Sequence, residues 1–137
     1  MRKVVIDTNC LVQMISLHSI YRPIWDAFLA NKFQLCISND ILEEYQEIIE
    51  EQTTFRIAEN VILLILNRRN VIFVDPHFRL GLIVEDPDDN KFVDCAFAAN
   101  ADYLVSDDKH LQILQRTPFP QLNLVKMAEF LKIVTTE

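Results

Sequence analysis

The sequence predicts a single three-layer α/β/α domain, residues 1–137, built on a central parallel sheet of about five strands. The main observation is that short β-branched apolar runs alternate along the chain with segments of helical periodicity. Parallel neighbours need long crossover connections, so this alternation favours a parallel sheet between helices. Half of the residues are hydrophobic and Gly81 is the one glycine, which leaves no flexible linker between domains.

Five short apolar runs are the predicted strands. They lie at 3–6, 34–37, 70–74, 103–106 and around 123–127. Helical spacing of apolar residues predicts helices at 21–31, 39–49, 55–67, 88–100 and 107–115, and a last one at the end of the chain. Residues 75–88 contain Pro76, Gly81 and Pro87, and we expect them to form a loop.

Composition excludes several classes of protein. No apolar run approaches the roughly 20 residues that span a bilayer, so we expect a cytoplasmic protein with no membrane partner. The three cysteines and three histidines lack the paired spacing of a zinc site or a disulfide framework. The net charge of -7 argues against a broad basic face for nucleic acid, but many acids crowd into residues 85–108, where they could hold cations.

Acidic residues follow two of the predicted strands directly. Asp7 comes after 3–6, and Asp107 and Asp108 come after 103–106. Ligands collect at the carboxyl ends of strands in an open parallel sheet, so these acids should face one crevice. Glu43 or Glu44, and Asp94, could reach the same crevice from the helices that follow 34–37 and precede 103–106.

Carboxylates gathered in this way repel one another unless a cation lies among them. Oxygen ligands without histidine or cysteine select hard ions, which indicates Mg²⁺ or Mn²⁺. Such an ion can activate water and stabilise the charge that develops on a phosphodiester. A single glycine excludes a P-loop or a dinucleotide fingerprint, so metal-dependent hydrolysis is the simplest interpretation.

Three stretches resemble the PIN-domain ribonucleases, many of which are toxins of bacterial toxin-antitoxin pairs. They are VVIDTNCLV at 4–12, ISNDILEEYQEII at 37–49 and DPDDNKFVDCAFAANADYLVSDDKHL at 86–111. The resemblance covers nearly the whole chain and implies an endoribonuclease that uses Mg²⁺ or Mn²⁺. It also implies an RNA substrate, a protein antitoxin as partner and a homodimer.

The resemblance assigns roles to individual residues. The four acids that it makes metal ligands and catalytic residues are Asp7, Glu44, Asp94 and Asp108. The residues that it makes supporting or alternative are Asn9, Ser106, Asp107, Asp89 and Glu43. Among these, Asp89 either adds a ligand or organises its loop.

Ordinary structural roles compete with these assignments. Asp7 could cap a helix that begins at Thr8, and Asp88 and Asp89 are well placed to cap the helix that follows them. One of Asp107 and Asp108 is expected to be a cap and the other a ligand.

Two other functions remain open at this stage. A phospho-receiver domain would need Asp75 as phosphoacceptor and Lys126 beside it. A catalytically inactive PIN-like binding module is the second alternative. Lys91 and Lys109 lie closest to the acids in sequence and are candidate phosphate contacts.

Overall fold

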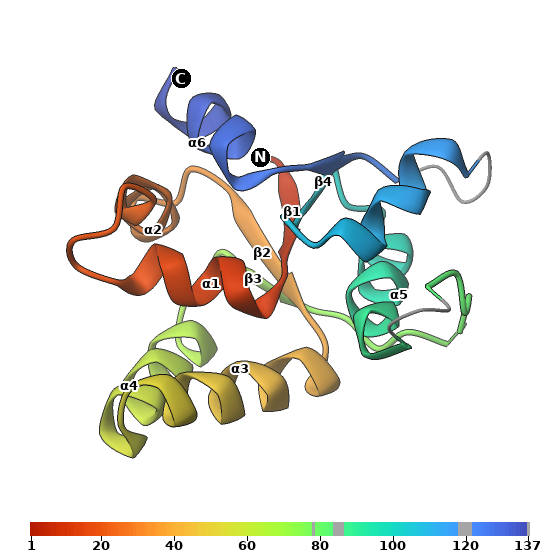
Figure 1. The fold of residues 1–137 in the computed structure, drawn as a ribbon. Coiled ribbons are helices and arrows are strands. Elements are labelled where there is room, and N and C mark those ends of the chain that lie inside the picture. The colour runs from red at the N-terminus through yellow and green to blue at the C-terminus, as the bar shows by residue number, and fades with distance from the viewer. Residues whose placement is uncertain (78, 84–86, 118–121, 137) are drawn as a thin grey trace.

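The computed structural model describes residues 1–77, 79–83, 87–117 and 122–136, and its centre is a five-stranded parallel sheet (Figure 1). The strand order is β3-β2-β1-β4-β5. The strands are β1 (Lys3–Ile6), β2 (Gln34–Ile37), β3 (Val71–Phe73), β4 (Tyr103–Val105) and β5 (Leu124–Val125). The predicted fold class is confirmed, and each observed strand lies within a predicted run.

Helices connect consecutive strands, as the alternating pattern predicts. They are α1 (Thr8–Ile15), α2 (Arg22–Leu29), α3 (Asn39–Gln52), α4 (Phe55–Leu66), α5 (Asn90–Ala99) and α6 (Met127–Thr135). Short 3₁₀ segments are η1 (Pro87–Asp89) and η2 (Lys109–Arg116). The expected helix at 107–115 is therefore a 3₁₀ helix, and α1 begins at Thr8 after the Asp7 cap.

The helices lie on both faces of the sheet. The chain moves from β1 to β2 to β3 in one direction and then returns across the sheet through α5 to β4. Right-handed crossovers therefore place α5 on the face opposite α1 to α4. Figure 1 shows α5 apart from α1 and α2, with the strands between them. No helix in the described ranges is long and apolar enough to cross a membrane.

The core is apolar on both sides of the sheet. The central strands are almost completely buried: Val4, Val5 and Ile6 of β1 have no exposed surface. The cysteines are free and buried in it, as expected for reduced core residues. All five strands run in one direction, so their carboxyl ends share one edge of the sheet and their amino ends share the other.

Candidate active site

Asp7 lies where β1 ends and α1 begins. Its Oδ1 accepts a 2.9 Å hydrogen bond from the backbone N–H of Cys10, which caps α1, and its Oδ2 accepts one from the hydroxyl of Ser106. Burial raises the pKa of the Asp7 carboxyl above its usual value; these hydrogen bonds oppose the shift and the charge of Asp108 adds to it. Asp7 is therefore a helix cap that is also electrostatically coupled to a second predicted acid.

Ser106 joins the carboxyl ends of β1 and β4. This serine is 1% exposed, and its hydroxyl donates to Asp7 and accepts a 3.0 Å hydrogen bond from the backbone N–H of Asp108. Asp107 binds elsewhere, because its Oδ1 accepts a 3.0 Å hydrogen bond from the backbone N–H of Met127 at the start of α6. The geometry therefore favours Asp108 over Asp107 as the partner of Asp7.

Asp89 and His110 lie beside Asp108. The three side chains each offer a ligand atom, and these atoms lie within 4.8 Å of one another. Burial alone would raise the pKa of Asp108, but the backbone hydrogen bond from His110, the side chain of Asp89 and nearby positive charge lower it. Asp89 precedes α5 but makes no capping hydrogen bond, so its expected capping role is wrong. Its carboxyl lies beside that of Asp108.

Asp108 is itself a cap. Its Oδ1 accepts a 2.8 Å hydrogen bond from the backbone N–H of His110 at the start of η2. The expectation that one aspartate of the pair caps and the other binds metal is therefore too simple, because Asp107 and Asp108 both accept backbone hydrogen bonds.

Glu44 reaches the end of β1 from α3. Its Oε2 accepts a hydrogen bond from the hydroxyl of Thr8, next to Asp7, and its Oε1 accepts one of 2.8 Å from Nζ of Lys91. Burial disfavours the charge of Lys91, but its hydrogen bond to Glu44 and the charge of Glu44 outweigh burial and raise the lysine pKa. Glu43 is exposed on α3. Of the two glutamates, Glu44 is thus the one that contacts the Asp7 region.

Asp94 lies on α5 and occupies a different environment. It is 5% exposed, and its Oδ1 accepts a 3.0 Å hydrogen bond from the backbone N–H of Leu80 in the preceding loop. Within the described part of the chain no hydrogen bond joins Asp94 to another predicted acid. Its role as a ligand stays a prediction. Asn9 is exposed in the first turn of α1.

Tyr45 is a site residue that sequence reasoning missed, because its spacing on α3 indicated only a core position. The side chain is fully buried, and its hydroxyl donates a 2.5 Å hydrogen bond to the carbonyl of Ile6, just before Asp7. Burial, together with nearby charge that includes Asp7, raises the tyrosine pKa well above its usual value, so the hydroxyl stays a neutral donor. A buried tyrosine requires a partner for its hydroxyl, but the sequence does not reveal which one.

The local charge favours a cation at this edge. The raised pKa of Asp7 reflects burial without enough positive charge nearby, and a divalent ion would supply that charge. The acidic side chains offer carboxylate oxygens as metal ligands, which fit Mg²⁺ or Mn²⁺. Lys91 already compensates Glu44.

The sheet order separates the two residues that a phospho-receiver site would need. Asp75 follows β3 and Lys126 follows β5, and these are the outermost strands on opposite sides. Four strand spacings of about 4.8 Å each put them roughly 19 Å apart. The topology therefore does not assemble a receiver-type site.

The fold and the site together define a class of protein: a parallel α/β domain with acids at the carboxyl ends of β1 and β4. Residues 3–110 match the family model of the PIN domain. The chain belongs to the PIN-domain family. No curated protein matches the chain.

Solved structures share the fold. The chain is similar to VapBC2 from Rickettsia felis bound to a DNA fragment from its promoter, with 21% identity and a TM-score of 0.63 over 90% of this chain and 98% of that one. It is also similar to DNA-bound VapBC from Salmonella typhimurium, with 19% identity and a TM-score of 0.65 over 93% of this chain and 99% of that one. The Mycobacterium tuberculosis toxin VapC20, which cleaves the Sarcin-Ricin loop, has 11% identity to this chain and a TM-score of 0.60 over 87% of this chain and 98% of that one. These likenesses concern the fold.

Proposed function

We propose that this protein is a metal-dependent endoribonuclease that hydrolyses RNA phosphodiester bonds. The observation that carries the proposal is the group at the ends of β1 and β4. Ser106 donates to the Asp7 carboxylate and accepts from the backbone N–H of Asp108, and Asp89 and Asp108 offer ligand atoms within 4.8 Å of one another. Glu44 joins the set through Thr8. Membership of the PIN-domain family supports nuclease chemistry at this position.

In this proposal Mg²⁺ or Mn²⁺ is held by Asp7, Glu44 and Asp108, with Asp89 or Asp94 as a further ligand. When bound, the ion supplies an activated water and compensates charge on the phosphodiester. The residues around the acids position them: Ser106 holds Asp7 through Oδ2, and Tyr45 fixes the backbone just before it.

Matched pairs of variants test the assignment. Glu44→Gln and Asp108→Asn should each slow cleavage of a purified RNA by roughly 100-fold or more, because each removes a ligand charge. The neighbouring changes Glu43→Gln and Asp107→Asn should leave the rate near that of the wild type. Equal activity of all four variants, in preparations free of contaminating nuclease, would show that these acids do not carry the reaction.

A second pair decides between the two candidate ligands on and before α5. Contact with Asp108 favours Asp89, whereas Asp94 is already bonded to a backbone N–H. We expect Asp89→Asn to remove activity and Asp94→Asn to retain most of it, since an asparagine oxygen can still accept the bond from Leu80. The reverse result would restore Asp94 as the ligand.

We further propose that the protein is the toxin of a toxin-antitoxin pair, inhibited in the cytoplasm by a protein antitoxin, and that it forms a homodimer. The fold shared with the VapBC structures supports this. Expression of the wild type should arrest growth, the Asp108→Asn variant should not, and the product of a neighbouring gene should relieve the arrest. Light scattering on the purified protein checks the dimer, and a monomer mass contradicts it.

One observation supports a second candidate, a PIN-like binding module without activity. Lys91 neutralises Glu44 through a 2.8 Å ion pair, so part of the acid group can fold without metal. A ligand that binds only the folded state raises the free energy of unfolding, by about 2.7 kcal/mol at 100 times its Kd. The melting temperature rises with it. The nuclease should therefore melt higher in Mn²⁺ than in EDTA, and an unchanged melting temperature favours the module.

A further inference from the structure

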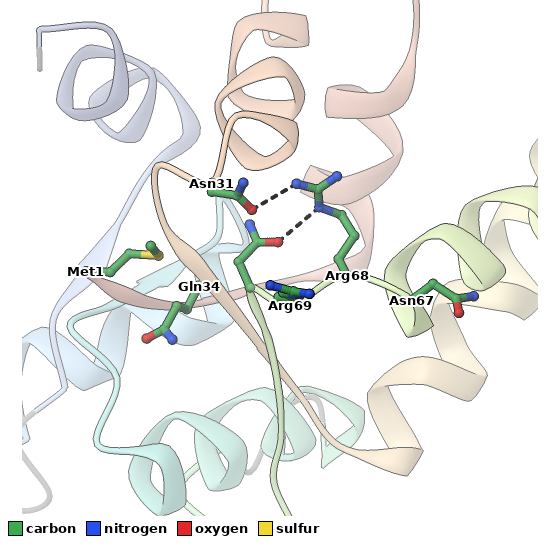
Figure 2. Close-up of a pocket in the computed structure, with 7 residues that line it drawn as sticks. Met1, Asn31, Gln34, Asn67, Arg68 and Arg69 are labelled. Atoms are coloured by element: carbon green, nitrogen blue, oxygen red, sulfur yellow. Dashed lines mark hydrogen bonds between the residues drawn. The ribbon is translucent and has the colours of Figure 1, made fainter.

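A pocket lies at the amino edge of the sheet, opposite the acids. It occupies about 410 Å³, and Figure 2 shows its residues gathered from three segments. These segments are the N-terminus, the stretch from the end of α2 into β2, and the connection from α4 to β3. The lining residues are Met1, Asn31, Gln34, Asn67, Arg68, Arg69 and Asn70. Among them are two arginines and no carboxylate.

Arg68 is held in place by neutral oxygens. Its Nε donates to Oδ1 of Asn70 at 3.0 Å, and its Nη2 donates to Oδ1 of Asn31 at 2.9 Å (Figure 2). The same Nη2 donates to the carbonyl of Leu29 at 2.8 Å. Its guanidinium carbon lies 5.4 Å from the ring centroid of Phe28. These contacts fix the guanidinium, and none of these partners carries a negative charge.

The partner of Arg68 is itself rigid. Asn70 is 3% exposed, and its Nδ2 donates to the carbonyls of Phe28 at 2.8 Å and Phe33 at 3.0 Å. Asn31 adopts a left-handed backbone conformation, with φ of 58°, in the turn after α2. The cation is therefore preorganised, which lowers the entropy lost when it binds a ligand.

Arg69 adds a second positive charge. Its side chain is exposed and lines the same pocket. Across the described residues, neither Arg68 nor Arg69 forms an ion pair with a carboxylate. The neighbouring amide side chains of Gln34 and Asn67 can donate hydrogen bonds to an anion.

The sheet topology concentrates basic residues near this pocket. Five of them precede or begin a strand at the amino edge: Arg2, Lys3, Lys32, Arg68 and Arg69. Among the described residues that precede or begin a strand, Asp102 is the acid at this edge, and its carboxylate accepts a 2.8 Å hydrogen bond from the backbone N–H of Lys3. A protein of net charge -7 thus places a positive edge opposite its acidic one.

We propose that this pocket binds a phosphate group. The bonds of Arg68 to Asn70, Asn31 and Leu29 use its Nε and Nη2 and leave its Nη1 to donate to a phosphate oxygen. Arg69 can donate the paired hydrogen bonds whose geometry matches phosphate oxygens, and the amide side chains add further donors. The phosphate could belong to a free phosphate compound or to an RNA backbone. The pocket lies on the edge opposite the acid group and does not depend on the nuclease function.

Nuclear magnetic resonance on the whole ¹⁵N-labelled protein tests the site in EDTA, which prevents cleavage. Inorganic phosphate is titrated at constant ionic strength, because salt screens non-specific attraction. We expect the side-chain signals of Arg68 Nε and the Asn31 amide to shift with saturation. Arg69→Gln should weaken binding roughly tenfold, about the effect of one charge-assisted contact, and Arg69→Lys should recover part of it.

The control is Arg56→Gln, which removes an exposed arginine on α4 outside the pocket. It should bind phosphate like the wild type, whereas an equal loss in both glutamine variants would overturn the proposal. Absence of saturable shifts at Arg68 and Asn31 would also overturn it. A short single-stranded oligoribonucleotide is the second probe. If it binds more tightly than phosphate and shifts the same signals, an RNA backbone is the source of the phosphate. If it binds more weakly, the source is a free phosphate compound.

Discussion

Asn70→Ala is a substitution for which the structure predicts a large loss of stability. The side chain is buried between the end of α2, the start of β2 and the connection to β3. It donates to the carbonyls of Phe28 and Phe33 and accepts from Nε of Arg68. Alanine leaves the carbonyls of Phe28 and Phe33, whose bonds to Asn70 are buried, and Nε of Arg68, whose bond is part-buried, without this partner.

The three hydrogen bonds set the expected magnitude. At about 1 kcal/mol each, their loss lowers the free energy of unfolding by about 3 kcal/mol. An entropy of unfolding of about 2.1 cal/mol/K per residue gives a chain of this length about 0.29 kcal/mol/K. The melting temperature should therefore fall by roughly 10 °C.

The assay is urea and thermal denaturation followed by circular dichroism. Asn67→Ala is the matched control, because Asn67 is exposed and donates one hydrogen bond, to the carbonyl of Leu63. That variant should stay within about 0.5 kcal/mol of the wild type. If Asn70→Ala also stays within that range, the hydrogen bonds of Asn70 do not stabilise the fold as argued.

Two further predictions concern the acid group. Lys91→Met removes the positive charge beside half-buried Glu44. It should lower the free energy of unfolding in EDTA by about 1 to 2 kcal/mol, and Mn²⁺ should restore part of that loss. Unchanged denaturation curves would contradict this prediction. Burial raises the pKa of the Asp7 carboxyl in the folded state above its ordinary value of 3.8. The folded protein therefore binds the carboxyl proton more tightly than the unfolded chain does. Stability in EDTA consequently falls as pH rises from 3.8 through the raised pKa. Asp7→Asn lacks this loss, so its stability relative to the wild type should increase over that interval in a pH series of urea denaturation. A difference that is independent of pH would refute the assignment.

The order of strands and helices could be predicted from the sequence because periodicity is a local property. Apolar runs such as KVVI and QLCI must be buried, and the connections between them are long enough to cross a parallel sheet. Parallel strands bring their carboxyl ends to one edge, so the placement of Asp7 and Asp108 at the same edge followed from their positions after β1 and β4. The helical cap at Asp7 follows from the same short stretch of sequence.

Choices between neighbouring residues needed the tertiary structure. Glu43 and Glu44 are adjacent on one helix, and the packing of α3 and α5 decides which glutamate meets Thr8 and Lys91. Asp89 does not make the capping hydrogen bond expected of it, and its side chain lies beside Asp108, which is distant in sequence.

The same distinction applies to the opposite edge of the sheet. The sequence by itself determined that basic residues precede the strands, and a parallel sheet then places them together. Only the tertiary structure decided that Arg68 is fixed by Asn31 and Asn70, since those bonds join segments that approach one another after folding. Local patterns fix which elements form, whereas the direction of each side chain depends on packing between distant segments.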